Sequence, residues 1–330
     1  MSKEDKIVIG QIGIGYWGPN LLRNFNSNKK CEIKKVVDLS SESISKIKDN
    51  YKSVHFSQDL DSIYDDDEIN AVVIATPVHT HYELSIRALN SRKHIFVEKP
   101  MAQNESEMRD IIRISEEKNL LAMVGHTYLY NSAIRLIKKM IDNHEIGKLR
   151  YIYCERTNLG KIRSDVDALW NLAPHDISII QYLLDDQEPT LVIKNGMSFI
   201  QKGIDDVSFM QIKYKNNIEA FIHASWLHPL KKRRIVIVGS ERMIIFDDMA
   251  ENKVSLYNKS VKINNNINPS GTSFDFDYLD NGIEYPTINW QEPLKVETNH
   301  FIDCILKGNP CLTDASHAMK VVKILSTKNS

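Results

Sequence analysis

A chain of 330 residues is long enough for about two domains, and its 42% hydrophobic residues can supply a core to each. The 42 Lys and Arg residues nearly balance the 43 Asp and Glu residues, which leaves a net charge of −1. No overall charge therefore draws the chain to nucleic acid or to an anionic membrane. We exclude a disordered or fibrous chain, and we expect neither a nucleic-acid partner nor a membrane partner.

Four cysteines include no C-x-x-C pair and no zinc-finger spacing: Cys31, Cys154, Cys304 and Cys311. We therefore expect reduced thiols, no metal site and a cytoplasmic location. The apolar run near the N-terminus is short, is interrupted by glycine and lacks a small-residue cleavage site, which favours a first strand over a signal peptide.

Over the first 125 residues, short β-branched runs alternate with helical patterns. Strands are predicted at residues 6–12, 32–38, 71–76, 93–98 and 121–125, with helices beginning near residues 17, 45, 79 and 104. Strands that alternate with helices predict a parallel, doubly wound sheet of the Rossmann type. We assign residues 1–125 to this nucleotide-binding domain.

The second half begins with a helical pattern at residues 132–143 and continues mainly as strand-like runs. These runs lie at residues 149–158, 190–199, 206–214, 218–227, 233–240 and 242–248. They predict an α+β domain over residues 126–330, built on a large, mostly antiparallel open sheet. Residues 261–290 are rich in Asn, Gly, Pro and Tyr and are predicted to form a long irregular loop, after which helices return from about Leu294.

A G-x-G-x-x-G sequence, formed by Gly13, Gly15 and Gly18 with Tyr16 and Trp17 inside it, directly follows the first predicted strand and opens a helix. In that context the first glycine permits a tight turn, the second lets the backbone approach a pyrophosphate, and the third allows close packing of helix and strand. The motif predicts dinucleotide binding, although a glycine-rich turn without a ligand is the alternative.

Asp38 ends the second predicted strand, 20 residues after Gly18. An acid at this position binds the adenosine ribose hydroxyls, and the residues that follow include no Arg to neutralise a 2′-phosphate. NAD is therefore favoured over NADP. The alternative role for Asp38 is to cap the next helix.

Two further polar sequences end strands in the half of the sheet where ligands collect. Thr76 and Pro77 follow one strand, and Glu98 and Lys99 end the next, just before Pro100. From its position alone, Lys99 is either a catalytic group or an exposed charge at the end of a strand.

Taken together, several motifs resemble the Gfo/Idh/MocA family of NAD(P)-dependent oxidoreductases. They are GIGYWG, the strand end ATP with His79 and His81 behind it, VEKP, and the histidine in LWNLAPHDISI. The resemblance covers nearly the whole chain. It implies an N-terminal Rossmann domain that binds the cofactor through the glycine loop and the strand ends, and a C-terminal open sheet that forms the substrate site.

The resemblance also implies the catalytic residues. Lys99 matches the lysine of the family's E-K-P motif, and His175 matches its catalytic histidine, whereas Asn171 replaces an aspartate that is common four residues before that histidine. Neutral imidazole can accept a hydroxyl proton while hydride leaves for NAD, and a lysine ammonium can stabilise the alkoxide. The alternative is that His175 is paired locally with Asp176.

Other positions carry two interpretations each. In relatives the segment that holds His126 and Asn131 lines the nicotinamide and substrate site, but an asparagine before a helix is often only its cap. Trp170 either stacks near the nicotinamide or a sugar, or belongs to the core. Arg163 is the preferred anchor for a diphosphate.

A basic run at residues 231–234 is a second diphosphate candidate together with Arg156, although such runs usually form the solvated entrance of a strand.

Within the family, the loop before His175 most resembles the nucleotide-sugar branch, which includes UDP-N-acetylglucosamine 3-dehydrogenases. This predicts NAD-dependent oxidation of the C3 hydroxyl of a nucleotide sugar, and the resemblance further implies a homodimer or homotetramer. One alternative is a 3-ketoreductase that acts on a nucleotide-linked deoxysugar with reduced cofactor. Another is a non-catalytic NAD-sensing regulator on the same fold.

Overall fold

The computed structural model describes residues 6–264 and 275–327. Within these residues the chain divides into two compact units. Unit 1 runs to Asn131 and resumes at Gln291–Ser326, whereas unit 2 begins at Ser132 and extends to Trp290.

Unit 1 contains a six-stranded parallel sheet in the order β3-β2-β1-β4-β5-β6. Its strands are β1 (Ile7–Ile12), β2 (Cys31–Val37), β3 (His55–Ser57), β4 (Ala71–Ile74), β5 (His94–Glu98) and β6 (Ala122–Gly125). The predicted doubly wound sheet is confirmed. β3 was not among the predicted strands, because three residues at a sheet edge are too few to show an alternation of polar and apolar side chains.

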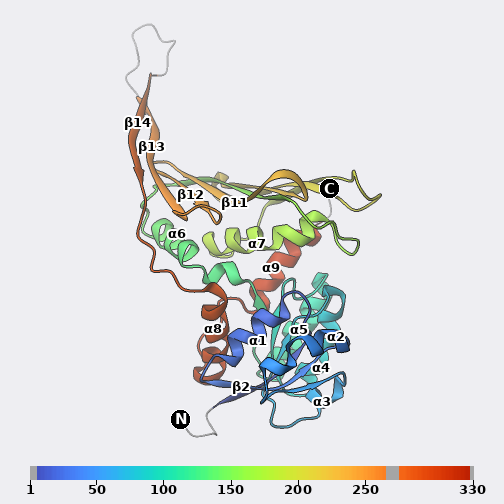
Figure 1. Cartoon of the computed structure of the whole chain (residues 1–330). Coiled ribbons are helices and arrows are strands. Elements are labelled where there is room, and N and C mark those ends of the chain that lie inside the picture. Colours follow the sequence, from blue (N-terminus) through green and yellow to red (C-terminus); the bar gives the residue numbers. More distant parts are fainter. Residues whose placement is uncertain (1–5, 265–274, 328–330) are drawn as a thin grey trace. The chain divides into compact units, whose positions relative to one another are not determined.

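The helices of unit 1 come from both ends of the chain (Figure 1). They are α1 (Gly18–Asn26), α2 (Ser41–Ile47), α3 (Asp61–Tyr64), α4 (His81–Asn90), α5 (Glu105–Glu117), α8 (Pro293–Lys307) and α9 (Ala315–Ser326), with short 3-10 helices η2 (Lys48–Asn50), η3 (Val78–Thr80) and η4 (Thr127–Tyr130). α8 packs on α1, and α9 packs on α5.

An aromatic cluster accounts for the place of α8 in unit 1. Phe25 of α1, Phe96 of β5 and Phe301 of α8 meet edge to face, with ring centroids 5.6 to 6.0 Å apart. All three side chains are fully buried, so they form part of the unit's core. The compact units thus differ from the predicted ranges 1–125 and 126–330, because the last two helices complete the core of unit 1.

Unit 2 contains an eight-stranded sheet in the order β14-β13-β12-β11-β7-β10-β9-β8. Every neighbouring pair is antiparallel except β7 and β10, so the predicted mostly antiparallel sheet is confirmed. The strands are β7 (Leu149–Leu159), β8 (Leu191–Met197), β9 (Val207–Lys213), β10 (Glu219–Ser225), β11 (Leu227–Gly239), β12 (Met243–Asp247), β13 (Val254–Asn264) and β14 (Asp275–Glu284), and the helical elements are α6 (Ser132–Asp142), α7 (Ala168–Leu183) and η5 (Lys215–Asn217).

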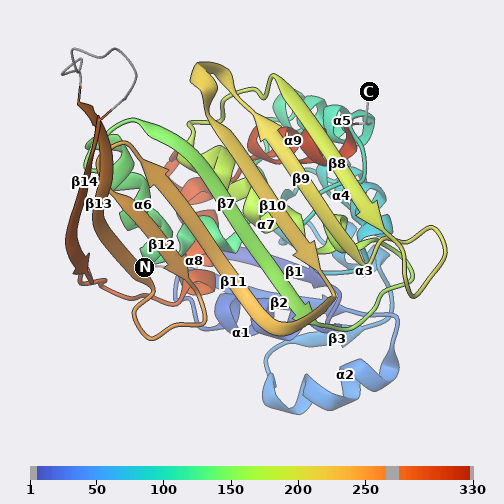
Figure 2. The same ribbon diagram turned by 90° about the horizontal axis from the view of Figure 1, so that it is seen from above.

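One face of this sheet is covered by α7, which packs against β7, β9 and β10 (Figure 2). The residues of β9 alternate accordingly: Ser208, Met210 and Ile212 are buried, whereas Phe209 on the other face is 44% exposed. The face opposite α7 also carries Ile193 of β8, which is 38% exposed.

The prediction of an irregular loop over residues 261–290 is wrong for much of that range. β13 and β14 pair there as antiparallel strands, with Val261 opposite Tyr278 and an ion pair of 2.9 Å between Lys259 and Asp280. Ladder hydrogen bonds and cross-strand pairs compensate for the low β-propensity of Asn and Asp. Residues 265–274 of the predicted loop lie outside the described residues. No helix in the described part of the chain is long and apolar enough to cross a membrane.

Candidate active site

The glycine loop follows β1 in unit 1, and two of its glycines are required by the protein itself. Gly13 has φ +92°, and a Cβ on it would lie 2.5 Å from the Ala75 carbonyl oxygen. A Cβ on Gly18 would lie 2.4 Å from the Gly13 carbonyl oxygen. Gly15, in contrast, has no protein atom within 4 Å of a Cβ built on it, so its space is open to a ligand.

The side chain of Gln11 fixes the shape of this loop. It is fully buried at the end of β1, and its Nε2 donates to the carbonyl oxygens of Gly13 (3.0 Å) and Gly18 (2.9 Å). These two bonds hold Gly13 and Gly18, the two ends of the loop, together. Gln11 was not among the predicted site residues, although a polar residue inside an apolar strand is a usable signal in the sequence.

The loop leads directly into the N-terminus of α1, which suits an anion. Trp17 is the N-cap residue but makes no side-chain cap, and the first turn contains no acid. Unpaired N–H groups at a helix start attract phosphate. Tyr16 and Trp17 are exposed by 97% and 39%, respectively. With the open space at Gly15, these residues fit the pyrophosphate of a dinucleotide.

Asp38 lies just beyond β2, beside the loop. Its two carboxylate oxygens accept hydrogen bonds from the backbone N–H groups of Ile14 and Ser40, both at 2.8 Å. The cap of the next helix is Ser40, whose Oγ accepts from the N–H of Ser43. The helix-cap alternative therefore does not apply to Asp38, which is instead tied to the glycine loop.

His81 connects the ends of β4 and β5. Its ring is buried, with Nδ1 2.8 Å from the Pro100 carbonyl oxygen and Nε2 2.8 Å from the Thr76 carbonyl oxygen. Burial lowers the pKa of His81. These contacts give His81 a positioning role at the two strand ends, whereas the nearby His79 and Pro77 are exposed.

At the end of β5, Glu98 lies between Lys99 and Trp17. Its Oε2 accepts from the backbone N–H of Lys99 (3.3 Å), and its carboxylate also bonds to the Trp17 side chain. Burial raises the pKa of Glu98 to about 7, against the lowering effect of the Lys99 charge. The glycine loop and the E-K-P segment are thus linked through one carboxyl group.

The segment after β6 adds a second buried carboxyl group that the sequence analysis missed. Thr127 Oγ1 donates to Glu297 Oε2 of α8 at 2.7 Å. Burial raises the pKa of Glu297 well above its ordinary value, and the Glu98 charge adds to that effect. The neighbouring His126 is buried, and its ring lies 5.2 Å from the ring of His317 in α9, whereas the buried Asn131 donates its backbone N–H to Tyr128 at the end of η4.

In unit 2, the predicted substrate residues lie in the first turns of α7 and in the loop before it. Asp167 caps this helix by accepting from the N–H of Trp170 (2.7 Å). Asn171 and His175, one turn apart, share a half-buried face. Asn171 Oδ1 accepts from the indole N–H of Trp226 at 3.2 Å, which fixes the orientation of its amide.

Asp176, the local partner that the alternative assigned to His175, binds a residue of the sheet. It forms a bidentate ion pair with Arg156 of β7, with both N–O distances 2.8 Å and both side chains buried. The pair ties α7 to the sheet. Arg156 is therefore engaged in a buried ion pair inside unit 2.

Three residues of the basic run and Arg163 are also paired with acids. Lys232 and Arg234 both bind Glu155, and Arg233 lies 3.6 Å from Asp248. Arg163 forms a bidentate pair with Asp165 in the loop before α7. Its side chain is still 39% exposed.

The parallel sheet, the open glycine turn and Asp38 define a dinucleotide-binding Rossmann fold. Two family models match the chain: an oxidoreductase family with an NAD-binding Rossmann fold over residues 7–126, and the Gfo/Idh/MocA C-terminal domain over residues 134–245. The chain belongs to the Gfo/Idh/MocA family, and NAD is its cofactor.

Curated relatives are moderately similar. The chain is 25% identical to the scyllo-inositol 2-dehydrogenase (NAD(+)) of Bacillus subtilis, with 83% of this chain and 79% of the relative covered. It is also 25% identical to the 2,7-anhydro-N-acetylneuraminate hydratase of Mediterraneibacter gnavus, with 72% and 66% covered.

Solved structures share the fold over nearly the whole chain. The UDP-N-acetylglucosamine 3-dehydrogenase GnnA from Acidithiobacillus ferrooxidans matches with a TM-score of 0.78 at 21% identity, covering 97% of this chain and 96% of that one. GenD2 from gentamicin A biosynthesis, solved in complex with NAD, matches with a TM-score of 0.81 at 17% identity, covering 97% and 92%.

Proposed function

We propose that this protein oxidises the C3 hydroxyl of a nucleotide sugar, with UDP-N-acetylglucosamine as the first candidate. When bound, NAD accepts the hydride from the carbon that bears the hydroxyl group. The proposal rests chiefly on Asn171 and His175, which place an amide and an imidazole one turn apart on α7. Structural similarity to a UDP-N-acetylglucosamine 3-dehydrogenase supports this choice of substrate class.

Lys99 is assigned to the stabilisation of the alkoxide that develops as hydride leaves. Its position at the end of β5 is fixed by Glu98 and by the carbonyl contacts of His81. Ionisation of Glu98, with a pKa of about 7, supplies a negative charge beside Lys99. That charge favours the ammonium form of Lys99 near neutral pH.

His175 is assigned to accept the hydroxyl proton, because neutral imidazole is a base at physiological pH. Asp167 caps the N-terminus of α7, and the ion pair of Arg156 with Asp176 ties this helix to the sheet. His175 therefore lies on a rigid element. Asn171 then binds a neighbouring sugar hydroxyl through its amide N–H groups.

The anchor for the diphosphate is Arg163, which must exchange Asp165 for phosphate oxygens. Because Arg163 is already paired with Asp165, a second candidate substrate is a free cyclic polyol, which needs no charged anchor. The relative that oxidises scyllo-inositol is in keeping with that candidate.

A substrate screen separates the two candidates. UDP- and TDP-sugars, free hexoses and inositols are incubated with NAD, NADH formation is followed by absorbance, and products are identified by mass and NMR. We expect the highest kcat/KM with a nucleotide sugar. Equal efficiency with an inositol would replace the proposal by polyol oxidation, and no turnover in either direction would favour the NAD-sensing regulator.

Variants test the assigned roles. We expect Lys99→Ala and His175→Ala to lower kcat by roughly 10²–10⁴ while NAD still binds. We expect Arg163→Ala to reduce kcat/KM for the nucleotide sugar far more than for a free sugar, because the anchor contributes only to the former. Arg150→Ala, an exposed arginine of β7, is the matched control.

We also propose self-association into a homodimer or homotetramer through the sheet face opposite α7. This face exposes Ile193, Phe209 and Tyr151, which are 38%, 44% and 40% accessible. Light scattering after gel filtration tests this, with Phe209→Lys expected to give monomers.

The four thiols, all free, favour a cytoplasmic location.

A further inference from the structure

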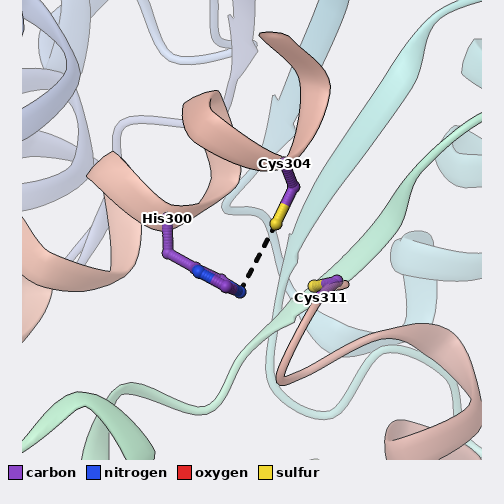
Figure 3. Close-up of side chains that lie close together, drawn as sticks. All are labelled: His300, Cys304 and Cys311. Atoms are coloured by element: carbon purple, nitrogen blue, oxygen red, sulfur yellow. Dashed lines mark hydrogen bonds between the residues drawn. The ribbon is translucent and has the colours of Figure 1, made fainter. Parts of the chain in front are cut away.

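One imidazole and two thiol groups lie close together at the C-terminal end of α8, although their spacing in the sequence predicts no metal site. His300 and Cys304 are one helical turn apart, and Cys311 follows the turn that ends the helix (Figure 3). Their ligand atoms all lie within 4.8 Å of one another, and His300 Nε2 is 3.4 Å from Cys304 Sγ. All three residues belong to unit 1.

The backbone fixes the position of Cys311 independently of any ligand. Gly308 ends α8 in the left-handed conformation, with φ +67°, and reverses the chain. Beyond the cysteine, the Thr313 carbonyl oxygen accepts from the N–H of Val124, and Asp314 forms a β-bridge with Met123 of β6. Cys311 is thus held between two anchored points, so the three donors are brought together by the fold.

The protonation of the cluster suits a metal ion. The backbone N–H of Leu312 donates to His300 Nε2 at 3.0 Å, so this nitrogen carries a lone pair rather than a proton. Cys304 Sγ lies 3.4 Å from the same nitrogen, which fits an S–H group that donates to His300 Nε2. The His300 nitrogen is therefore ready to act as a ligand, and the two sulfurs become ligands when a metal ion displaces their protons.

We propose that His300, Cys304 and Cys311 bind one Zn²⁺ ion, with a water molecule as the fourth ligand. One imidazole and two thiolates are the donor set that zinc prefers over Mg²⁺ or Ca²⁺. Zinc bonds of about 2.0 to 2.3 Å at tetrahedral angles place the donor atoms roughly 3.5 to 3.8 Å apart, so no pair needs to contract by more than about 1.3 Å.

Binding exchanges partners without any change of oxidation state. The ion takes the lone pair of His300 Nε2 in place of the Leu312 N–H, and the protons of Cys304 and Cys311 leave for solvent. The two thiolates neutralise the charge of the ion. The bound ion ties the end of α8 to the segment that pairs with β6, so it stabilises unit 1.

Cobalt substitution tests the site in the full-length protein. The reduced protein is freed of metal with a chelator and titrated with Co²⁺, which gives visible d–d bands and near-ultraviolet thiolate charge-transfer bands in a tetrahedral site. We expect saturation at one equivalent per chain and displacement of Co²⁺ by Zn²⁺. We also expect added Zn²⁺ to raise Tm by mass action.

Single variants identify the ligands. Cys311→Ser, at a half-buried position, should abolish the charge-transfer bands and the rise in Tm while the protein still binds NAD, and Cys304→Ser should do the same. Cys31→Ser, a buried thiol elsewhere in unit 1, is the control and should keep both signals. A reduced wild-type protein without cobalt bands would overturn the proposal, as would bands that survive Cys311→Ser, or a disulfide between Cys304 and Cys311 that persists under reductant.

Discussion

Single residues of the glycine loop show which features serve the fold and which serve the ligand. Gly18 is surrounded by protein atoms, whereas Gly15 faces open space. No protein atom requires glycine at position 15, whereas Gly13 and Gly18 are required by the protein itself. We therefore attribute the glycine at position 15 to the bound cofactor, which needs the space that a side chain would fill.

Gly15→Ala and Gly18→Ala should therefore have different effects. The first should leave the free energy of unfolding within about 0.5 kcal/mol of the wild type and weaken NAD binding by roughly tenfold or more. The second should destabilise the protein by about 1–3 kcal/mol, because the new methyl group overlaps the Gly13 carbonyl oxygen. Urea unfolding and NAD titration calorimetry measure the two effects. A Gly15→Ala protein with wild-type affinity for NAD would contradict this assignment.

Glu297 carries a second prediction at the residue scale, on pH dependence. Its carboxyl is fully buried and burial raises its pKa well above the ordinary value, so between the unfolded and the folded pKa the folded protein holds a proton that the unfolded chain releases. The contribution of Glu297 to the free energy of unfolding is at its maximum below about pH 4. It falls by about 1.4 kcal/mol per pH unit above that, for as long as the folded carboxyl stays protonated.

Glu297→Gln should remove this decline, so the variant should gain stability relative to the wild type as pH rises from 5 to 7. Urea unfolding at several pH values measures the difference. Glu292→Gln is the control, because Arg23 holds the pKa of this half-exposed carboxyl below its usual range, and the variant should gain nothing. A constant difference between the wild type and Glu297→Gln would show that Glu297 is ionised in the folded protein.

At the scale of elements, the ion pair of Arg156 with Asp176 joins β7 to α7. Both side chains are buried, so loss of one leaves an uncompensated charge. Arg156→Met should cost about 3–5 kcal/mol of stability, and the double variant Arg156→Met/Asp176→Leu should recover most of it. Chemical denaturation of the three variants measures the coupling. Additive losses in the double variant would contradict a buried pair of this kind.

Elements with a strong local pattern could be predicted from the sequence. β1, β2, β4, β5 and β6 are short β-branched runs between helical patterns, and the glycine loop follows the first of them. Their order along the chain is sufficient to place Asp38 and Lys99 at strand ends. β13 and β14 could not be predicted, because their polar residues depend on pairing across the sheet, with each other and, for β13, with β12.

Contacts between distant segments could not be predicted either. Glu297 meets Thr127 across 170 positions of sequence, and Arg156 meets Asp176 through the packing of a helix on a sheet. A residue's type signals such contacts only when it conflicts with its surroundings, as Gln11 does inside β1. The pairing of Arg163 with Asp165 is local, but it depends on a loop conformation that no periodic pattern specifies.

At the scale of the whole molecule, unit 1 is built from two stretches of chain that the sequence separates by unit 2. The predicted boundary near residue 125 follows a real change of pattern, from alternating strands and helices to a run of strands. The packing of α8 and α9 in the core of unit 1 could not be predicted, because the sequence of an amphipathic helix does not indicate which sheet the helix covers.

A chain that ends at residue 131 should therefore fail to fold, although it contains all six strands of the parallel sheet. It lacks Phe301, which meets Phe25 and Phe96 edge to face, and it exposes the surface of α5 that α9 covers. Loss of one such buried aromatic side chain costs about 3–5 kcal/mol, a large part of the stability of a domain of this size.

Restoring the missing stretch in one chain should rescue the fold. Residues 1–131 joined to residues 291–330 by about ten Gly and Ser residues would span roughly 17 Å, which suffices because Thr127 and Glu297 are already hydrogen-bonded. We expect this chain to unfold cooperatively and to bind NAD, with Phe301→Ala in the same chain lowering its Tm. Circular dichroism and NAD titration check both points. Cooperative folding and NAD binding by residues 1–131 alone would show that α8 and α9 are dispensable for unit 1.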